Sequence, residues 1–179
     1  MAKTYTLHVA GLTRELPICK INDHLDIAAF IMFSDVELTI ACAKALLEKC
    51  PDFDVILTAE AKGIPLAYEM SRQSGKQWIP ARKGVKGYMA DPVIVEDQSI
   101  TTAGKQKLVI DRKELDKMNG KRVLVVDDVI STGGSLKALD ALAEKTQCTI
   151  VGQAAVLAEG DAAERKDIIF LEPLPLFFH

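Results

Sequence analysis

The amino-acid sequence predicts an α/β fold, in which an open and mostly parallel sheet is flanked by helices. From residue 55 onward, short apolar runs of strand length alternate with stretches of helical period. The runs lack the apolar–polar alternation of half-exposed strands, as expected for strands that are covered on both faces. The chain has 179 residues, 49% of them hydrophobic, which is enough for one domain with a core. We therefore expect a single domain over 1–179.

The first thirty residues have a different pattern, in which apolar and polar side chains alternate. The alternation runs over 4–9 and again over 16–21, with Gly11 between the two runs and Pro17 inside the second. Alternation of this kind, interrupted by turn residues, is typical of half-exposed strands. It predicts a hairpin or a pair of short strands at the N-terminus.

The first helix is predicted by a possible capping box, the S-x-x-E pattern from Ser34 to Glu37. In this motif the serine oxygen accepts a backbone amide and the glutamate reaches back to the cap. The helix should run to about Lys49, ahead of Pro51. Its apolar residues recur at helical spacing, which predicts one buried face, made by Val36, Ile40, Ala43, Leu46 and Leu47.

The remaining regular elements follow from the alternation described above. We expect strands over 55–57, 78–81, 123–126, 150–157 and 168–171, and helices over 65–74 and 136–145. In open parallel sheets, ligands bind beyond the carboxyl ends of the strands. Chemistry should therefore be sought in the turns that follow Leu57, Ala81 and Val126.

The stretch 83–106 does not fit the alternation, because glycines and Pro92 interrupt it. Within it, the polar segment 99–104 resembles a turn between the apolar runs 93–95 and 108–110. A long excursion from a compact α/β sheet is typical of a lid or a binding loop.

Charge and hydropathy exclude several classes of protein. No apolar run approaches the roughly eighteen residues of a membrane span, and the first five residues lack the apolar core of a signal peptide. We therefore expect a cytoplasmic protein without a membrane partner. The net charge of −3 also argues against nucleic acid. The segment 82–122 is nevertheless basic, with ten basic and six acidic side chains, either as a solvated face or as a site for a small polyanion.

Cysteine and histidine are too scattered for a metal site. The four cysteines form no C-x-x-C pair, and the three histidines have no partner at helical spacing. We expect no metal to be held by the protein alone.

The strongest motif is VLVVDDVISTGGS, which spans 123–135. A buried strand carries two adjacent carboxylates, Asp127 and Asp128, and a turn of hydroxyls and glycines then opens a helix. Glycines permit close backbone approach, and the amides of a helix start favour an anion, so the turn should hold a phosphate. Carboxylates beside an anion must face donors such as sugar hydroxyls. The expected phosphate residues are Ser131, Thr132, Gly133, Gly134 and Ser135.

Other phosphate motifs are absent from the sequence. Each Gly-Lys pair is followed by Gln or Arg where a P-loop needs Ser or Thr, and no G-x-G-x-x-G follows a strand. These absences exclude a P-loop nucleotidase and leave a dinucleotide site without its fingerprint.

The motif at 123–135 resembles the phosphoribosyl-pyrophosphate (PRPP) motif of the type I phosphoribosyltransferases, above all that of the adenine and xanthine enzymes. The resemblance extends from about Ser34 to the C-terminus. It implies the fold of that family and catalysis with PRPP and a purine base, with Mg²⁺ bound together with PRPP. By this similarity Asp127 and Asp128 hold the ribose hydroxyls, and 131–135 binds the 5′-phosphate.

Two further segments resemble the pyrophosphate sites of this family. Thr58 to Gly63 resembles its pyrophosphate loop, with Ala61 and Lys62 at the contact, although adenine enzymes often carry arginine where Lys62 stands. The R-K-x-x-K pattern resembles the segment that supplies cations to pyrophosphate. Its residues here are Arg82, Lys83 and Lys86.

The resemblance makes 89–107 the catalytic loop, acting within one subunit or across two. Adenine enzymes carry an L-E-Y-G-like element with a glutamate for proton transfer, whereas this chain reads VEDQSITTAGK. Glu96 or Asp97 would substitute. Val129 and Ile130 are expected to form an apolar wall beside the base, with core packing as the alternative reading. The predicted catalytic residues are then Asp127, Asp128, Lys83 and Glu96.

The expected function is therefore that of a purine phosphoribosyltransferase in purine salvage. Adenine is favoured, with xanthine or hypoxanthine/guanine as alternatives, because base selectivity in this family depends on variable hood loops. The other alternative is a PRPP-binding regulator without catalysis, although purine repressors carry a winged helix and only 33 residues precede Ser34. Family members are commonly homodimers, so 1–33 and 172–179 are expected to form a hood over the base or an interface.

Overall fold

A five-stranded parallel sheet forms the centre of the computed structural model, which describes residues 3–97 and 106–179. Neighbouring strands pair in the order β10-β9-β8-β4-β5, and every pairing is parallel. The predicted fold class is thus confirmed. The strands are β4 (Val55–Ala59), β5 (Gln77–Ala81), β8 (Arg122–Ile130), β9 (Thr149–Glu159) and β10 (Ile169–Leu174).

The strand order places a topological switch point between β4 and β8. From β4 the chain proceeds outward to β5, and it then returns to the other side of β4 to build β8, β9 and β10. Loops leaving β4 and β8 therefore diverge to opposite faces of the sheet and leave a crevice at their carboxyl ends, where ligands of such folds bind.

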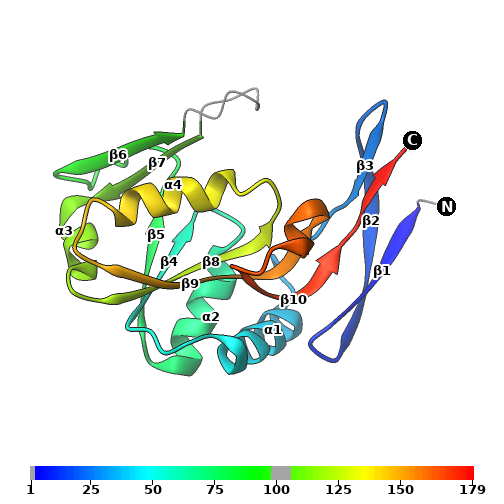
Figure 1. The fold of residues 1–179 in the computed structure, drawn as a ribbon, viewed down its shortest axis with the longest axis horizontal. Helices are drawn as coiled ribbons and strands as arrows, with labels where there is room; N and C mark the ends of the chain where they lie inside the picture. Colours follow the sequence, from blue (N-terminus) through cyan, green and yellow to red (C-terminus); the bar gives the residue numbers. More distant parts are fainter. Residues whose placement is uncertain (1–2, 98–105) are drawn as a thin grey trace.

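Layers cover both faces of the sheet, as Figure 1 shows. The helices α1 (Val36–Lys49) and α2 (Ile64–Ser74) pack on one face. On the other lie α4 (Gly134–Ala143), the short helices α3 (Arg112–Leu115) and η1 (Asp116–Met118), and an antiparallel hairpin. Successive residues of β4 alternate between the two cores, so the strand is buried on both sides as its continuous apolar sequence predicts.

The hairpin consists of β6 (Pro92–Asp97) and β7 (Gln106–Asp111), within the stretch that did not fit the alternation. The predicted apolar runs 93–95 and 108–110 pair with each other, Ile94 opposite Val109. The predicted turn at 99–104 lies outside the described residues. Strand β7 also bridges to Arg82 just after β5, which joins the hairpin to the edge of the sheet.

A second, antiparallel sheet combines both ends of the chain, and we call it the hood sheet. Its strands are β1 (Thr4–Val9), β2 (Leu12–Asn22), β3 (Leu25–Ala28) and β11 (Leu176–Phe178), in that order. Figure 1 shows it beside the end of the central sheet, with the two termini close together. The sequence indicated the hairpin β1–β2 but not β3 or β11, which are too short for a period to be recognised.

Two expectations for the first helix are wrong. The N-cap is Asp35 rather than Ser34, since the Asp35 carboxylate accepts the amide of Leu38 at 3.1 Å. Glu37 does not reach back to the cap, because its carboxylate binds Arg14. Val36 and Ile40 are exposed instead of buried, because Leu38 and Cys42 supply the buried face together with Ala43 and Leu46.

Strand β8 is longer than predicted. It continues through both aspartates to Ile130, which pairs with Ala158 of the still longer β9. Asp127 and Asp128 therefore lie on a rigid strand rather than in the turn after it. No helix in the described part of the chain is long and apolar enough to cross a membrane.

Candidate active site

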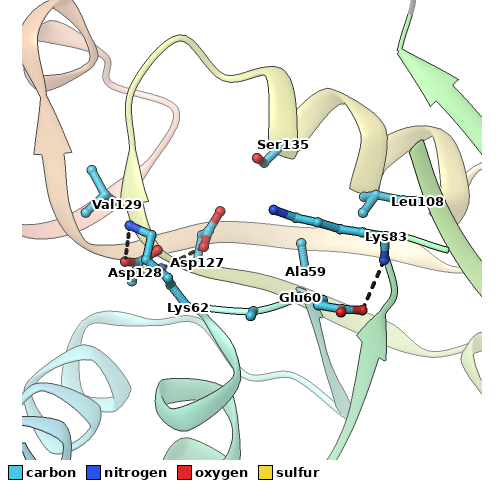
Figure 2. A pocket seen from close by; sticks show the side chains of 10 residues that line it. Ala59, Glu60, Lys62, Lys83, Leu108, Asp127, Asp128, Val129 and Ser135 are labelled. Carbon is cyan, nitrogen blue, oxygen red and sulfur yellow. Dashed lines mark hydrogen bonds and ion pairs between the residues drawn. The ribbon is translucent and has the colours of Figure 1, made fainter. Parts of the chain in front are cut away.

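Three cavities adjoin at the carboxyl ends of β4 and β8, the switch point of the sheet. The central cavity, about 210 Å³, lies between the segment after β4, Lys83 and the aspartates of β8 (Figure 2). The helix cavity, about 200 Å³, lies at the start of α4, and the hood cavity, about 390 Å³, faces the hood sheet. Val129 borders all three, so they form one continuous site.

The helix cavity is built by the turn between β8 and α4. All five predicted phosphate residues, 131–135, line it together with Asp127. Gly133 has φ +81°, a left-handed conformation that glycine adopts without strain, and α4 begins directly after it. The first turn of α4 contains no acidic residue, so its amides and the positive end of its dipole favour an anion.

The two aspartates occupy the floor between the helix cavity and the central cavity. Asp128 is 3% exposed, and its carboxylate forms an ion pair with Lys62 at 2.8 Å. Asp127 accepts a hydrogen bond from the amide of Asp128 at 2.8 Å. Burial raises the pKa of Asp127, the neighbouring Asp128 carboxylate raises it further, and Lys62 partly opposes both. This pair of carboxylates therefore readily binds a proton or a positively charged group.

Within 3–97 and 106–179, four cationic side chains lie in or near the central cavity, and two of them share one carboxylate. Arg82 binds Glu60 at 2.6 Å, and the Lys86 ammonium lies 3.9 Å from the same side chain. The Arg82 hydrogen bond is the main reason why the pKa of Glu60 is lowered. Among the described residues the Lys83 ammonium has no carboxylate partner, and Figure 2 shows its side chain reaching across the cavity toward Asp127 and Ser135.

Gly63 is a site residue that the sequence analysis did not single out. A Cβ atom here would lie 2.5 Å from Thr58 Oγ1 and 3.1 Å from Asp127 Oδ1. The absence of a side chain lets the segment after β4, in which the Glu60–Ala61 peptide bond is cis, pack directly against β8. In the sequence Gly63 was only the last residue of the segment that resembles the pyrophosphate loop, with no role of its own.

The hood cavity is mainly apolar. Val129 faces it, as expected for a residue beside the base, whereas Ile130 is 2% exposed, packs in the core under α4 and borders only the helix cavity. The lining residues are Ile27, Ala28, Ala29, Phe30, Ile31, Ser131, Glu159 and Leu174, with Lys62 at the junction to the central cavity. Residues 27–31 and Leu174 lie within the ranges expected to form a hood or an interface, whereas Glu159 was not singled out from the sequence.

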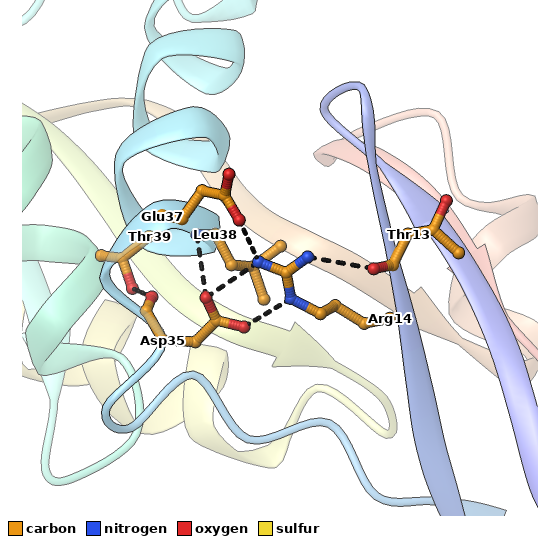
Figure 3. A network of polar contacts seen from close by, with 6 residues as sticks. All are labelled: Thr13, Arg14, Asp35, Glu37, Leu38 and Thr39. Atoms are coloured by element: carbon orange, nitrogen blue, oxygen red, sulfur yellow. Dashed lines mark hydrogen bonds and ion pairs between the residues drawn. The ribbon is translucent and has the colours of Figure 1, made fainter.

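A charged network, which we call the Arg14 clamp, holds the hood sheet against α1 (Figure 3). The Arg14 guanidinium in β2 donates to both oxygens of Asp35, at 2.7 and 3.1 Å, and to Glu37 at 2.8 Å. This arginine is the main cause of a lowered pKa at Asp35. The segment 27–31 lies between β3 and this clamp, so both of its ends are fixed over the hood cavity.

Glu96 lies away from these cavities. It is exposed on β6, opposite Lys107 of β7, and lines none of the three. The Asp97 side chain and the centre of the expected catalytic loop, 98–105, lie outside the described residues.

At the switch point of the sheet, an anion cradle lies beside two paired carboxylates and several cationic side chains. This combination suits a sugar phosphate with a second anionic group. The family comparison agrees, because residues 37–174 match the phosphoribosyl transferase domain. The chain belongs to this family of PRPP-dependent glycosyltransferases, with the type I fold.

Relatives in the family include enzymes for different purines. The chain is 32% identical over 126 residues to an adenine phosphoribosyltransferase of Rhodococcus jostii, covering 70% of this chain and 69% of that protein. It is 30% identical over 149 residues to the Chlorobium limicola adenine enzyme, covering 77% and 81%. A hypoxanthine/guanine phosphoribosyltransferase of Ferroglobus placidus is 38% identical over 114 residues, covering 64% and 57%.

Solved structures share the fold at lower identity. The adenine phosphoribosyltransferase of Thermoanaerobacter pseudethanolicus superposes with a TM-score of 0.67 at 23% identity, covering 79% of this chain and 84% of that one. The Saccharomyces cerevisiae enzyme, complexed with an imino-altritol bisphosphate and adenine, gives 0.64 at 19% identity and covers 94% and 93%.

Proposed function

We propose that the protein is a cytoplasmic purine phosphoribosyltransferase, which joins a free purine, with adenine favoured, to the phosphoribosyl group of PRPP. One observation carries the proposal: three cavities with different chemistry adjoin at Val129. A phosphate cradle, a cavity lined by lysines and carboxylates, and a mainly apolar cavity suit the 5′-phosphate, the pyrophosphate with its Mg²⁺, and the base.

The helix cavity would bind the 5′-phosphate through the amides and hydroxyls of 131–135. Asp127 and Asp128 would accept hydrogen bonds from the ribose hydroxyls. Both carboxylates border the central cavity from the rigid strand β8, so the sugar would lie over the floor with its reacting carbon between the other two cavities.

The central cavity would bind the pyrophosphate. Lys62 and Lys83 line it directly, together with Ala61, while Arg82 and Lys86 lie behind Glu60. In the reaction the bond from ribose C1′ to the pyrophosphate oxygen breaks, the base nitrogen bonds to C1′, and the base loses a proton. Negative charge grows on the departing pyrophosphate, so cations already in place there lower the barrier electrostatically.

The donor set suits Mg²⁺ that enters with PRPP. Carboxylate oxygens of Glu60, Asp127 and Asp128 border the cavity, and oxygen is the donor that Mg²⁺ prefers. The described residues contain no cluster of three His, Cys, Asp or Glu side chains able to hold a metal unaided. When bound, Mg²⁺ would supply charge neutralisation on the pyrophosphate.

The hood cavity would bind the base. Its apolar wall suits the faces of a purine ring, and the two adenine phosphoribosyltransferases reported above favour adenine. Because a hypoxanthine/guanine phosphoribosyltransferase is also among the relatives, hypoxanthine and guanine are alternatives. Xanthine is a further alternative.

Pyrophosphate release tests this proposal. PRPP and Mg²⁺ are incubated separately with adenine, hypoxanthine, guanine, xanthine, uracil and orotate. Release with a purine alone supports the enzyme and names the base. PRPP binding by calorimetry without release from any base would instead favour a PRPP-binding regulator.

A paired substitution tests the assignment of the ribose. Asp127→Asn together with Asp128→Asn should abolish PRPP use while the circular dichroism spectrum stays unchanged. Unchanged turnover in this variant would contradict the assignment.

We also propose that the protein is a homodimer. Val36, Ile40 and Tyr68 are exposed by 67%, 43% and 56%, and they line a groove of about 240 Å³ between α1 and α2. Exposed apolar side chains gathered at one groove are typical of a protein interface. Sedimentation of the wild type should give a dimer, which Ile40→Glu should dissociate; a monomeric wild type would refute the proposal.

A further inference from the structure

The hood cavity contains one acidic side chain among the described residues that line it, Glu159. The other polar side chains in its wall are Lys62 and Ser131. Lys62 is already engaged, because it pairs with the buried Asp128. Glu159 is therefore the charged hydrogen-bond acceptor that this mainly apolar wall offers to a ligand, beside the neutral hydroxyl of Ser131.

Two sheets hold Glu159 in place. It is the last residue of β9 and pairs with Leu174 of β10, at the carboxyl edge of the central sheet. Gly160 follows with φ +58°, and a Cβ atom there would lie 2.6 Å from Leu176 Cδ1 in β11. The turn after Glu159 is therefore packed tightly against the hood sheet. The backbone at Glu159 is therefore fixed at the border of the hood cavity.

The Glu159 carboxylate is half-buried and has no ion pair or hydrogen bond among the described residues. A carboxylate that borders an apolar cavity loses water when a ligand fills that cavity, and it then needs a donor in exchange. Every free purine carries a ring N–H group, and adenine carries an amino group as well. Purine donors therefore match what Glu159 lacks.

We propose that Glu159 determines base recognition by accepting a hydrogen bond from an N–H group of the purine in the hood cavity. The proposal rests on the proposed function and adds to it the residue that reads the base. It differs from the expectation for Glu96, which is exposed on β6 and lines none of the three cavities.

Steady-state kinetics of Glu159→Gln test the proposal, with Glu172→Gln as the matched control. Glu172 is an exposed glutamate of the neighbouring strand β10 and lines none of the three cavities. Glu159→Gln should lower kcat/KM for adenine by about 10–100-fold, the loss expected for one hydrogen bond to a charged group, with KM for PRPP changed less than twofold. The control should leave both values unchanged.

A shorter acid and a smaller base sharpen the test. Glu159→Asp keeps the charge and should retain more activity than Glu159→Gln. With unsubstituted purine, which lacks the amino group, a smaller effect of Glu159→Gln than with adenine assigns the bond to that group, and an equal effect assigns it to the ring N–H.

Failure of the inference is distinct from failure of the proposed function. A wild type that releases pyrophosphate with no purine refutes the proposed function. Binding of free adenine by calorimetry still tests Glu159, and Glu159→Gln should weaken it at least tenfold. Wild-type kcat/KM or wild-type adenine affinity in Glu159→Gln would overturn the inference, as would an equal loss for the base and for PRPP.

Discussion

Replacement of Gly63 by alanine is expected to disrupt the contact between the segment after β4 and β8. Gly63 has φ −72°, which alanine adopts without strain, so the effect comes from the added methyl group alone. That group would lie 2.5 Å from Thr58 Oγ1 and 3.1 Å from Asp127 Oδ1. Thr58 is fully buried and branched at Cβ, so it has little room to move aside.

The expected cost follows from packing. Adding a methyl group to a packed interior costs about 1–3 kcal/mol, while Gly→Ala restricts the unfolded chain and returns about 0.4–1 kcal/mol. The net loss of roughly 1–2 kcal/mol should lower Tm by about 2–8 °C for a chain of this size. Because the loop must move away from Asp127, KM for PRPP should rise as well. Calorimetric melting and pyrophosphate-release kinetics measure the two effects.

Two companion variants make the reasoning refutable. Gly87→Ala is the control, since a Cβ atom there meets nothing within 4 Å. Thr58→Ala in the Gly63→Ala background removes the closest obstacle, and Thr58 Oγ1 has no hydrogen-bond partner to lose within the part of the chain that the structure describes. The double variant should regain part of the PRPP affinity. If Gly63→Ala behaves like Gly87→Ala, the close approach has no energetic consequence.

Three further predictions concern charge. Because the pKa of Asp127 is raised, the folded protein holds a proton that the unfolded chain releases. The free energy of unfolding should therefore fall as pH rises above about 4. Urea titrations at several pH values should show a flatter pH dependence for Asp127→Asn, and an unchanged dependence would contradict the raised pKa. Arg14→Gln should raise KM for the base but not for PRPP, because the Arg14 clamp holds only the hood sheet and segment 27–31. Equal increases in both KM values would count against this role. Lys83→Gln combined with Lys86→Gln should lower kcat more than nucleotide affinity, whereas equal losses would mean that these cations bind the ground state alone.

Much of the fold can be predicted from local patterns in the sequence. The elements that cannot be predicted in this way depend on contacts between residues far apart in the chain. The runs at 55–57 and 123–126 predicted parallel strands because burial on both faces leaves an unmistakably apolar sequence. Strand β11 is three residues long and exists through pairing with β3, which is almost 150 positions away in sequence. No local period announces such a strand.

The site divides in the same way. The turn at 131–135 is contiguous in sequence, so its glycines and hydroxyls indicated the helix cavity directly. The hood cavity combines 27–31, Val129 and Glu159, which meet only when the two sheets assemble. Arg14 likewise binds Glu37, the residue that a capping box would have turned back to the helix start, and this long-range contact cannot be recognised from a local pattern.

The pairing of β3 with β11 also has a consequence for biosynthesis. The strands and the turn that line the helix and central cavities all precede residue 137 in the chain, whereas the hood sheet needs its last strand, Leu176–Phe178. On the ribosome the residues that line the helix and central cavities are therefore synthesised before the strand that completes the hood sheet. That sheet is complete only once Leu176–Phe178 has paired with β3.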